Sequence, residues 1–202
     1  MLDIKDAKVA IPVVLIAGLF WSFGPYVVRH IDEAQQVPWQ YLFTRGIVIF
    51  IILNLFLYLE EGKDFFYNYK KIGISGLIGG VGLGIAMISF IYSITNTSAA
   101  VTLLCLAAMP FITALLGFMF LKGEISTNVW VAISIATVGI IIMAIDNTSN
   151  NTVIGLVFGL LSSVGFAVFS TTLRWKKETP KFTTVSVAGL FCCLFSGIMI
   201  AY

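Results

Sequence analysis

The sequence predicts an all-α protein, a polytopic bundle of transmembrane helices, and three observations support this fold class. First, 59% of the 202 residues are hydrophobic and only 11% are charged, with a mean hydropathy of +1.00, which is not the composition of an ordinary soluble domain. Second, apolar stretches of about 20 residues, the length that crosses a ~30 Å hydrocarbon core, follow one another along the chain. Third, positive charges gather in alternate loops.

Seven apolar stretches are long enough to be membrane spans. They cover residues 9–29, 39–59, 72–93, 98–121, 127–145, 153–173 and 184–202. Thr95 to Ser98 separate the third stretch from the fourth, because a single helix over both would have about 50 residues and be about 75 Å long. Pro38 can open the second helix, and Ser126 or Thr127 can cap the fifth. The loops are short, so any function must reside among the helices.

Lysine and arginine residues accumulate on one side of the membrane that these spans define. The N-terminus and the second, fourth and sixth loops carry all but two of them: Lys5, Lys8, Lys63, Lys70, Lys71, Lys122, Arg174, Lys176, Lys177 and Lys181. By the positive-inside rule we expect a cytoplasmic N-terminus and a multi-pass protein of the cell inner (plasma) membrane. The net charge of +2 is explained by this topology, and we expect no nucleic-acid partner.

A weak internal repeat relates the first span to the sixth. The first copy recurs 145 residues later, with Gly18, Ser22, Pro25 and Arg29 matched by Ser163, Ala167, Ser170 and Arg174. Spacings of four, three and four residues place each set on one helix face. The copies lie five spans apart, an odd number, so the second copy is expected to be upside down, as in the inverted-topology repeats of secondary transporters. Chance similarity between two apolar helices is the alternative.

The repeat divides the chain into two units. We expect a complete five-helix unit at residues 1–145 and the first two helices of a second, inverted unit at residues 146–202. The chain stops soon after Ser196 with no polar tail behind it. The expectation is therefore a fragment in which the second repeat lacks about three helices.

Small and polar residues mark one face of the third span. They recur from Ser75 to Asn96 at spacings of four and three, with large aliphatic residues opposite, and glycines at 76, 80 and 84 allow close helix approach. This face can serve packing alone, or its polar end, from Tyr92 to Asn96, can line a cavity.

Two prolines interrupt helical hydrogen bonding inside the spans. Thr102 and Thr113 share a face of the fourth span on either side of Pro110, which leaves the carbonyl of Leu106 without its helical donor. In the first span, Pro25 likewise leaves the carbonyl of Trp21 without its helical donor. Water or a neighbouring helix must satisfy such groups in a membrane, so each proline can be structural or can mark a helix break that gates a pathway.

Arg45 is the strongest single indication of function. It lies seven residues after Pro38, about 10 Å along the helix axis, and no acidic residue lies in any predicted span to pair with it. Its side chain can snorkel to the outer interface. Alternatively, it faces the bundle interior and binds an anionic group of a substrate.

The sequence predicts no enzyme, cofactor or metal site. Residues 73–76 form a Gly-x-Ser-Gly motif like that of rhomboid intramembrane proteases, but the nucleophile Ser75 would need a base. Ser75 lies near the inner membrane face, whereas the only histidine, His30, lies beyond the outer end of the first span. The three cysteines lie in apolar spans, and we interpret them as packing residues rather than disulfides or metal ligands. They are Cys105, Cys192 and Cys193.

Together these residues resemble the EamA family of the drug/metabolite transporter superfamily, over essentially the whole chain. The resemblance rests on Trp21-Ser22, Arg45, the turn from Tyr92 to Ala100, and Pro110 followed by the Gly-Glu loop at 122–126. It implies ten helices in two inverted units, a central cavity and export of amino acids or related small metabolites. The chain departs from the family by ending after the seventh helix. Glu124 of the loop can also be read as a carboxylate favoured by the dipole of the fifth helix.

We therefore expect a permease that works by alternating access, with a site between the two repeats near the membrane midplane. The candidates for substrate binding are Trp21, Ser22, Arg45, Tyr92, Asn96, Thr102 and Thr113. The candidates for helix breaks or gating are Pro25 and Pro110. The expected partners are the lipid bilayer and a small-molecule substrate, with a homodimer left open. A non-transporting membrane scaffold or sensor is the alternative function.

Overall fold

The computed structural model describes residues 7–30, 38–62, 65–123, 126–146 and 150–202. Over these ranges the chain is helical almost throughout and contains no β-strand, which confirms the predicted all-α class. The helices are α1 (Ala7–His30), α3 (Pro38–Glu61), α4 (Phe65–Lys71), α5 (Gly73–Asn96), α6 (Ala99–Ala107), α7 (Met109–Leu121), α8 (Thr127–Asp146), α9 (Asn150–Trp175) and α10 (Lys181–Ala201). An apolar chain in lipid adopts helices because they satisfy their own backbone hydrogen bonds.

Six helical stretches of the described chain are long and apolar enough to cross a membrane, which confirms a polytopic helical bundle. They are Ile11–Val28, Pro38–Glu60, Gly73–Asn96, Ala99–Leu121, Val153–Trp175 and Lys181–Ala201. The predicted fifth span coincides with α8, but the apolar stretch described there is the shorter Thr127–Gly139. The predicted fifth span therefore stays a prediction.

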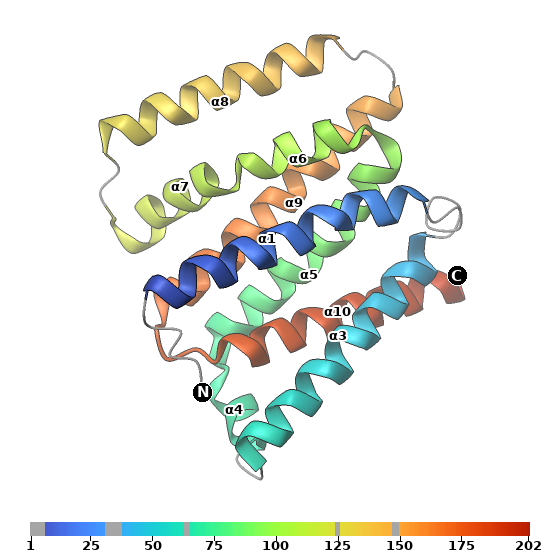
Figure 1. Cartoon of the computed structure of the whole chain (residues 1–202), viewed down its shortest axis with the longest axis vertical. Coiled ribbons are helices and arrows are strands. Elements are labelled where there is room, and N and C mark those ends of the chain that lie inside the picture. The colour runs from blue at the N-terminus through green and yellow to red at the C-terminus, as the bar shows by residue number, and fades with distance from the viewer. Residues whose placement is uncertain (1–6, 31–37, 63–64, 124–125, 147–149) are drawn as a thin grey trace.

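Most of the helices lie side by side in one layer (Figure 1). Their order is α8, then α6 with α7, then α9, α5, α10 and α3, and α1 lies across the middle of the layer. The central helix α5 packs most extensively against α9, and α10 fills the space between α5 and α3. The two helices of residues 146–202 are therefore inserted among those of residues 1–145, on either side of α5.

Small residues on two faces of α5 allow these close contacts. On the α9 side, a Cβ atom added at Gly165 would lie 2.5 Å from the carbonyl oxygen of Gly82. On the α10 side, a Cβ atom at Gly80 would lie 2.7 Å from Val187, and one at Gly84 would lie 2.5 Å from a ring carbon of Phe191. Side chains would separate these helices. The small face predicted from the sequence thus serves packing along most of its length.

Two local features differ from the expected helices. The predicted fourth span consists of two helices, because α6 ends at Ala107 and α7 begins at Met109 with Pro110 in its first turn. Backbone N–H groups there have no helical acceptor, so the missing N–H of proline costs nothing. The predicted loop before the third span contains the short helix α4. In α4 the rings of Phe65 and Tyr69 lie 5.3 Å apart, one helical turn from each other.

The segments that carry the excess positive charge share one end of the bundle. The start of α1, the helix α4, the end of α7 and the turn from α9 to α10 lie there (Figure 1). The end of α1, the start of α3, the turn from α5 to α6 and the start of α9 lie at the opposite end. This is the alternation that the charge distribution predicts. Following the orientation expected from the positive-inside rule, we label the first the inner end and the second the outer end.

Candidate functional site

The break between α6 and α7 is stabilised by α9. The backbone N–H of Ala108 donates to Cys105 O at 3.1 Å, and Ser163 Oγ of α9 donates to the same carbonyl at 2.6 Å. The sequence predicted that the carbonyl needing a partner is that of Leu106. In the structure α6 already ends before Pro110, and Ala108 N–H also turns back to Leu106 O.

Buried hydroxyl groups connect α5, α6 and α9 near that break. Ser93 Oγ donates to Gly155 O at 2.8 Å and shares a 2.9 Å hydrogen bond with Thr102 Oγ1. Ser162 Oγ donates to Ala86 O at 2.9 Å. The three hydroxyl side chains are fully buried. Thr102, a predicted site residue, is therefore satisfied within the helix contacts, and a ligand would have to displace these bonds to reach it.

Trp21 places α1 over the junction of α5 and α9. Its ring lies 6.4 Å from that of Phe90, nearly parallel at 20°, and 6.1 Å from that of Phe166 at 86°. Trp21 is nonetheless 53% exposed, and the adjacent Ser22 donates only to Gly18 O of its own helix. Most of the described side chains of α1 are exposed. The helix α1 thus covers the layer without being embedded in it.

The two predicted proline breaks differ. The helix α1 continues through Pro25 from Ala7 to His30 without a gap, whereas α6 and α7 separate just before Pro110. Of the two positions, only Pro110 accompanies a discontinuous helix. Discontinuous transmembrane helices often form the binding sites of transporters.

Arg45 lies on α3, half-buried, beside the closest approach of α3 to α10. A Cβ atom at the neighbouring Gly46 would lie 2.7 Å from the backbone nitrogen of Cys193. The thiol of Cys192 donates to Leu42 O at 3.5 Å and lies within electrostatic range of Arg45. Within the part of the chain that the structure describes, Arg45 has neither an ion-pair nor a hydrogen-bond partner.

A second polar group without a partner lies near the same thiol. Ser196 follows Cys192 by one turn of α10 and is fully buried. Its Oγ lies beside the Cys192 thiol but completes no hydrogen bond with any described group. Buried hydroxyl groups are normally hydrogen-bonded. Arg45 and Ser196 thus lie on the contacting helices α3 and α10, and both act on the Cys192 thiol.

Tyr92 belongs to an aromatic cluster at the outer end. Its ring lies 5.0 Å from that of Trp39 and 5.3 Å from that of Phe158, and Trp39 lies 5.7 Å from Phe195. Tyr92 and Phe90 are two residues apart on α5, hence about 200° apart around the helix. The Tyr92 cluster and the Trp21 contacts therefore lie on different sides of α5.

The side chain of Asn96 forms hydrogen bonds within the last turn of α5. Its Nδ2 donates to Tyr92 O at 2.8 Å, four residues earlier on the same helix. Its remaining contact is with the neighbouring Thr95 Oγ1 at 3.4 Å. The polar end of the third span thus makes mostly local hydrogen bonds.

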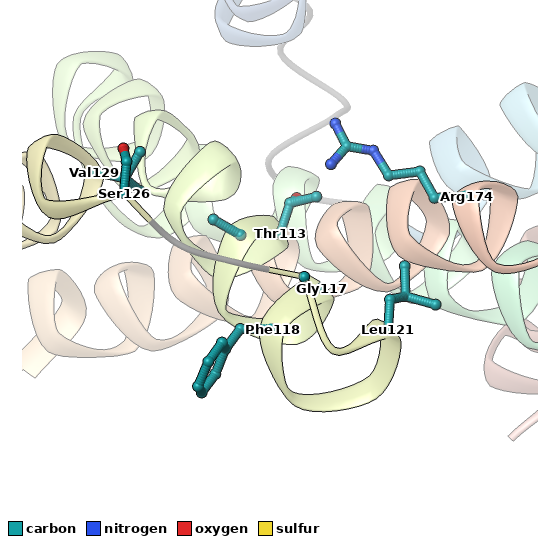
Figure 2. A pocket seen from close by; sticks show the side chains of 9 residues that line it. Thr113, Gly117, Phe118, Leu121, Ser126, Val129 and Arg174 are labelled. Carbon is teal, nitrogen blue, oxygen red and sulfur yellow. The ribbon is translucent and has the colours of Figure 1, made fainter.

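Thr113 lies apart from the other predicted site residues, in a pocket between α7, α8 and α9. The pocket has a volume of about 320 Å³, and Arg174 at the end of α9 lines it. Thr113 Oγ1 donates to Met109 O at 2.8 Å. Figure 2 shows the Arg174 guanidinium turned toward Thr113 across the pocket. The sequence indicated Arg174 only as the counterpart of Arg29 in the repeat.

A polar contact at the inner end joins α3, α4 and α10 and was not predicted. Tyr69 OH donates to Asn54 Oδ1 at 2.7 Å and lies 2.8 Å from Ser186 Oγ, while Asn54 Nδ2 donates to Ser186 Oγ at 2.7 Å. Asn54 could have indicated this contact from the sequence, because an amide inside an apolar span needs a hydrogen-bond partner. Tyr69 could not be found in this way, because it lies outside the predicted spans.

The protease motif and the cysteines occupy packing positions. Ser75 is fully buried and its Oγ lies 2.9 Å from Thr179 Oγ1, while α1 ends at His30 at the opposite end of the bundle (Figure 1). The three cysteines are free thiols. Among the described residues no group of three or more His, Cys, Asp or Glu side chains could hold a metal ion.

The sequence is similar to one known protein family and to curated transporters. Residues 8–145 match the EamA-like transporter family. An uncharacterized transporter of Helicobacter pylori strain J99 is 24% identical over 191 residues, which cover 93% of this chain and 62% of that protein. A second, from strain 26695, is 24% identical over 192 residues, covering 94% and 63%. This chain thus spans under two thirds of the length of these curated relatives. No solved structure matches it significantly.

Proposed function

Because this chain belongs to the EamA-like transporter family, we propose that it forms part of a membrane transporter for amino acids or related small metabolites. The observation that carries the proposal is the pair of unsatisfied groups on facing helices, Arg45 of α3 and Ser196 of α10. Neither group contributes a described hydrogen bond to the fold. Both are suited to a carboxylate that enters from outside the protein.

The energetics favour a ligand role for Arg45. An arginine at the centre of a membrane helix costs about 2.5–3.5 kcal/mol on translocon scales, and less near the interface. A substrate carboxylate would offset this cost by accepting two parallel hydrogen bonds from the planar guanidinium. The hydroxyl of Ser196 could donate a further hydrogen bond to the same group.

Alternating access is the proposed mechanism, with α1 as the moving cover. Support comes from the side chains of α1, most of which are exposed, and from Trp21, which rests on Phe90 and Phe166. A helix that makes few contacts can leave and return at low cost. Trp21 would then enclose substrate when α1 closes. We keep Ser22, Tyr92, Asn96, Thr102 and Thr113 as predicted site residues, although their described hydrogen bonds and ring contacts are internal.

The proposal includes two inverted units and a cytoplasmic inner end. Residues 1–145 would form the first unit, and residues 146–202 would begin the second. Support comes from the opposite directions of α1 and α9 in the bundle (Figure 1), since these helices carry the two copies of the repeat. The inner end, which holds most of the lysine and arginine residues, would face the cytoplasm of a cell with the protein in its inner membrane.

Substitution of Arg45 tests the function. In vesicles that contain the full native protein and a radiolabelled amino-acid mixture, Arg45→Ala should reduce transport at least about tenfold, because a charged hydrogen-bond pair contributes about 1.5–3 kcal/mol. Arg45→Lys should be partly active, because lysine keeps the charge but loses the two-pronged geometry. The matched control, Lys177→Ala, removes an exposed cation and should transport normally.

Two outcomes would contradict this role. If Arg45 only snorkels, Lys should substitute fully and Ala should do little harm, so unchanged transport by a well-inserted Arg45→Ala protein removes it from the site. If the unsubstituted protein moves none of the amino acids across the membrane, a scaffold or sensor becomes the better interpretation.

A further inference from the structure

Three polar side chains join α3 to α10 at the inner end of their contact. Tyr69 OH of α4 donates to Asn54 Oδ1 of α3 at 2.7 Å and lies 2.8 Å from Ser186 Oγ of α10, while Asn54 Nδ2 donates to Ser186 Oγ at 2.7 Å. Ser186 is fully buried, and the other two are half-buried. Each member of this triad therefore bonds to both of the others, and Tyr69 is the member that lies outside the predicted spans.

Between the triad and Arg45 the backbones of α3 and α10 are in contact. A Cβ atom at Gly189 would lie 3.1 Å from Gly46 O, and one at Gly46 would lie 2.8 Å from Gly189 O. Asn54 follows Arg45 by nine residues, about 14 Å along α3. Arg45 is therefore separated from the inner end by the glycine contact and then by the triad.

Tyr69 is the member of the triad that can move away at the lowest cost. The helix α4 has seven residues, too few to be stable by itself in water, and among the described helices it packs mainly against α3. When Tyr69 moves away, Asn54 Nδ2 keeps its bonds to Ser186 Oγ and to Phe50 O. Asn54 Oδ1 loses its donor, which water at the inner end can replace. A segment with few contacts opens locally more readily than the helices that it covers.

We propose that Tyr69 is a latch at the inner end of the α3–α10 contact, and that its release lets water enter this contact as far as the glycine pair. Alternating access needs such an opening, because a substrate bound at Arg45 must be open to one side of the membrane at a time. The latch rests on the proposed function for this role alone. Its release is measured without substrate, so the two proposals can fail separately.

Thiol labelling at position 49 tests the latch. Ile49 lies one turn of α3 from Arg45, toward the inner end, and packs against a buried cluster of α5 and α10. The full native protein with Ile49→Cys is treated in inverted vesicles with a small membrane-impermeant thiol reagent, and the same protein without this cysteine corrects for the native thiols. Tyr69→Phe should raise the labelling rate about tenfold, because the rate follows the open population and the hydrogen bonds of the hydroxyl are lost.

Matched variants assign the effect to the triad. Tyr67→Phe removes the hydroxyl of an exposed tyrosine of the same helix and should leave the rate unchanged. Ser186→Ala, which leaves Tyr69 bound to Asn54 alone, should raise the rate about threefold. The variant with both Tyr69→Phe and Ser186→Ala should stay near tenfold rather than reach about thirtyfold, since groups in contact are not additive. Equal rates for the two tyrosine variants would overturn the latch, as would the full product in the double variant.

A second labelled position separates a latch from a general loosening of the two helices. Phe43 lies nearer the outer end of α3, and its ring would be 3.2 Å from a Cβ atom at Gly197 of α10. With Phe43→Cys labelled from the outer side, Tyr69→Phe should leave the rate unchanged or lower it. A higher rate there would overturn the proposal. A protein that transports without the Tyr69 effect rejects the latch alone, whereas one that shows the effect without transporting keeps the latch and rejects the transport.

Discussion

Helices α1 and α9 carry the two segments that the sequence matched as a possible repeat, yet the surroundings of these segments differ. In α9, Ser163 and Ala167 are fully buried, and Ser163 donates to the carbonyl of Cys105 near the end of α6. In α1, the corresponding Gly18 has open space around it and Ser22 is exposed. The motif permits close packing, but a partner with a matching surface decides whether packing occurs. For α9 that partner is the small face of α5 and the broken helix α6–α7.

The contrast assigns different roles to the two helices. The helix α9 contacts α5, α6 and α7, and its hydroxyl side chains satisfy backbone groups on α5 and α6. It therefore belongs to the fixed part of the molecule. The helix α1 rests on the layer mainly through Trp21 and the buried Val28. In the proposed mechanism it is the part that moves.

Replacing one glycine by alanine in each helix should give the largest difference in the free energy of unfolding between α9 and α1 variants. Gly165→Ala should lower the free energy of unfolding by about 1–3 kcal/mol, because the new methyl group meets the backbone of Gly82, which cannot rotate away. Gly18→Ala should leave stability unchanged or raise it by up to about 1 kcal/mol, because alanine is the better helix former. Equilibrium unfolding by dodecyl sulfate in mixed micelles measures both.

Equal effects at these two positions would break the comparison. A destabilised Gly18→Ala protein would mean that α1 is packed as closely as α9. A tolerated Gly165→Ala protein would mean that α5 and α9 are farther apart than described. Circular dichroism before denaturation checks that both variants start from the same helix content.

Removing one serine hydroxyl from each helix should give a smaller difference in the free energy of unfolding. Ser163→Ala should cost about 0.5–1.5 kcal/mol, because Cys105 O loses its donor from α9 but keeps the N–H of Ala108. Ser22→Ala should change the free energy of unfolding by less than about 0.5 kcal/mol, because the side chain is exposed and bonds only its own helix. The same unfolding titration applies. A larger loss from Ser22→Ala than from Ser163→Ala would contradict the assignment of α9 to the fixed part.

Local features of the sequence predicted much of the fold. Length and hydropathy identify the spans, and Pro110 indicates where a helix is interrupted, because proline lacks the N–H that would continue it. The small faces of α5 follow from residue spacing. What spacing cannot tell is which helix each face meets. The insertion of α9 and α10 on either side of α5 depends on contacts between distant segments, so it was not predicted.

The candidate site was predicted less well, for a physical reason. A polar residue in an apolar span must have a partner, but the sequence does not say whether that partner is the residue's own helix, a neighbour or a ligand. Asn96 and Thr113 bond to their own helices and Thr102 also bonds to Ser93. For Arg45 no such partner is described. Ser196 was missed as a site residue because a serine between apolar residues resembles a packing position.

The opposite orientation of α1 and α9 in the membrane is the central claim, and labelling from the two sides tests it most directly. Single cysteines are introduced at position 7, where α1 begins, and at position 150, where α9 begins, and are treated with a membrane-impermeant thiol reagent in intact cells and in inverted vesicles. Protein without an added cysteine corrects for the native thiols. We predict that position 150 is labelled in intact cells and position 7 only in inverted vesicles. Labelling of both positions from the same side would contradict the inverted arrangement and the proposed mechanism with it.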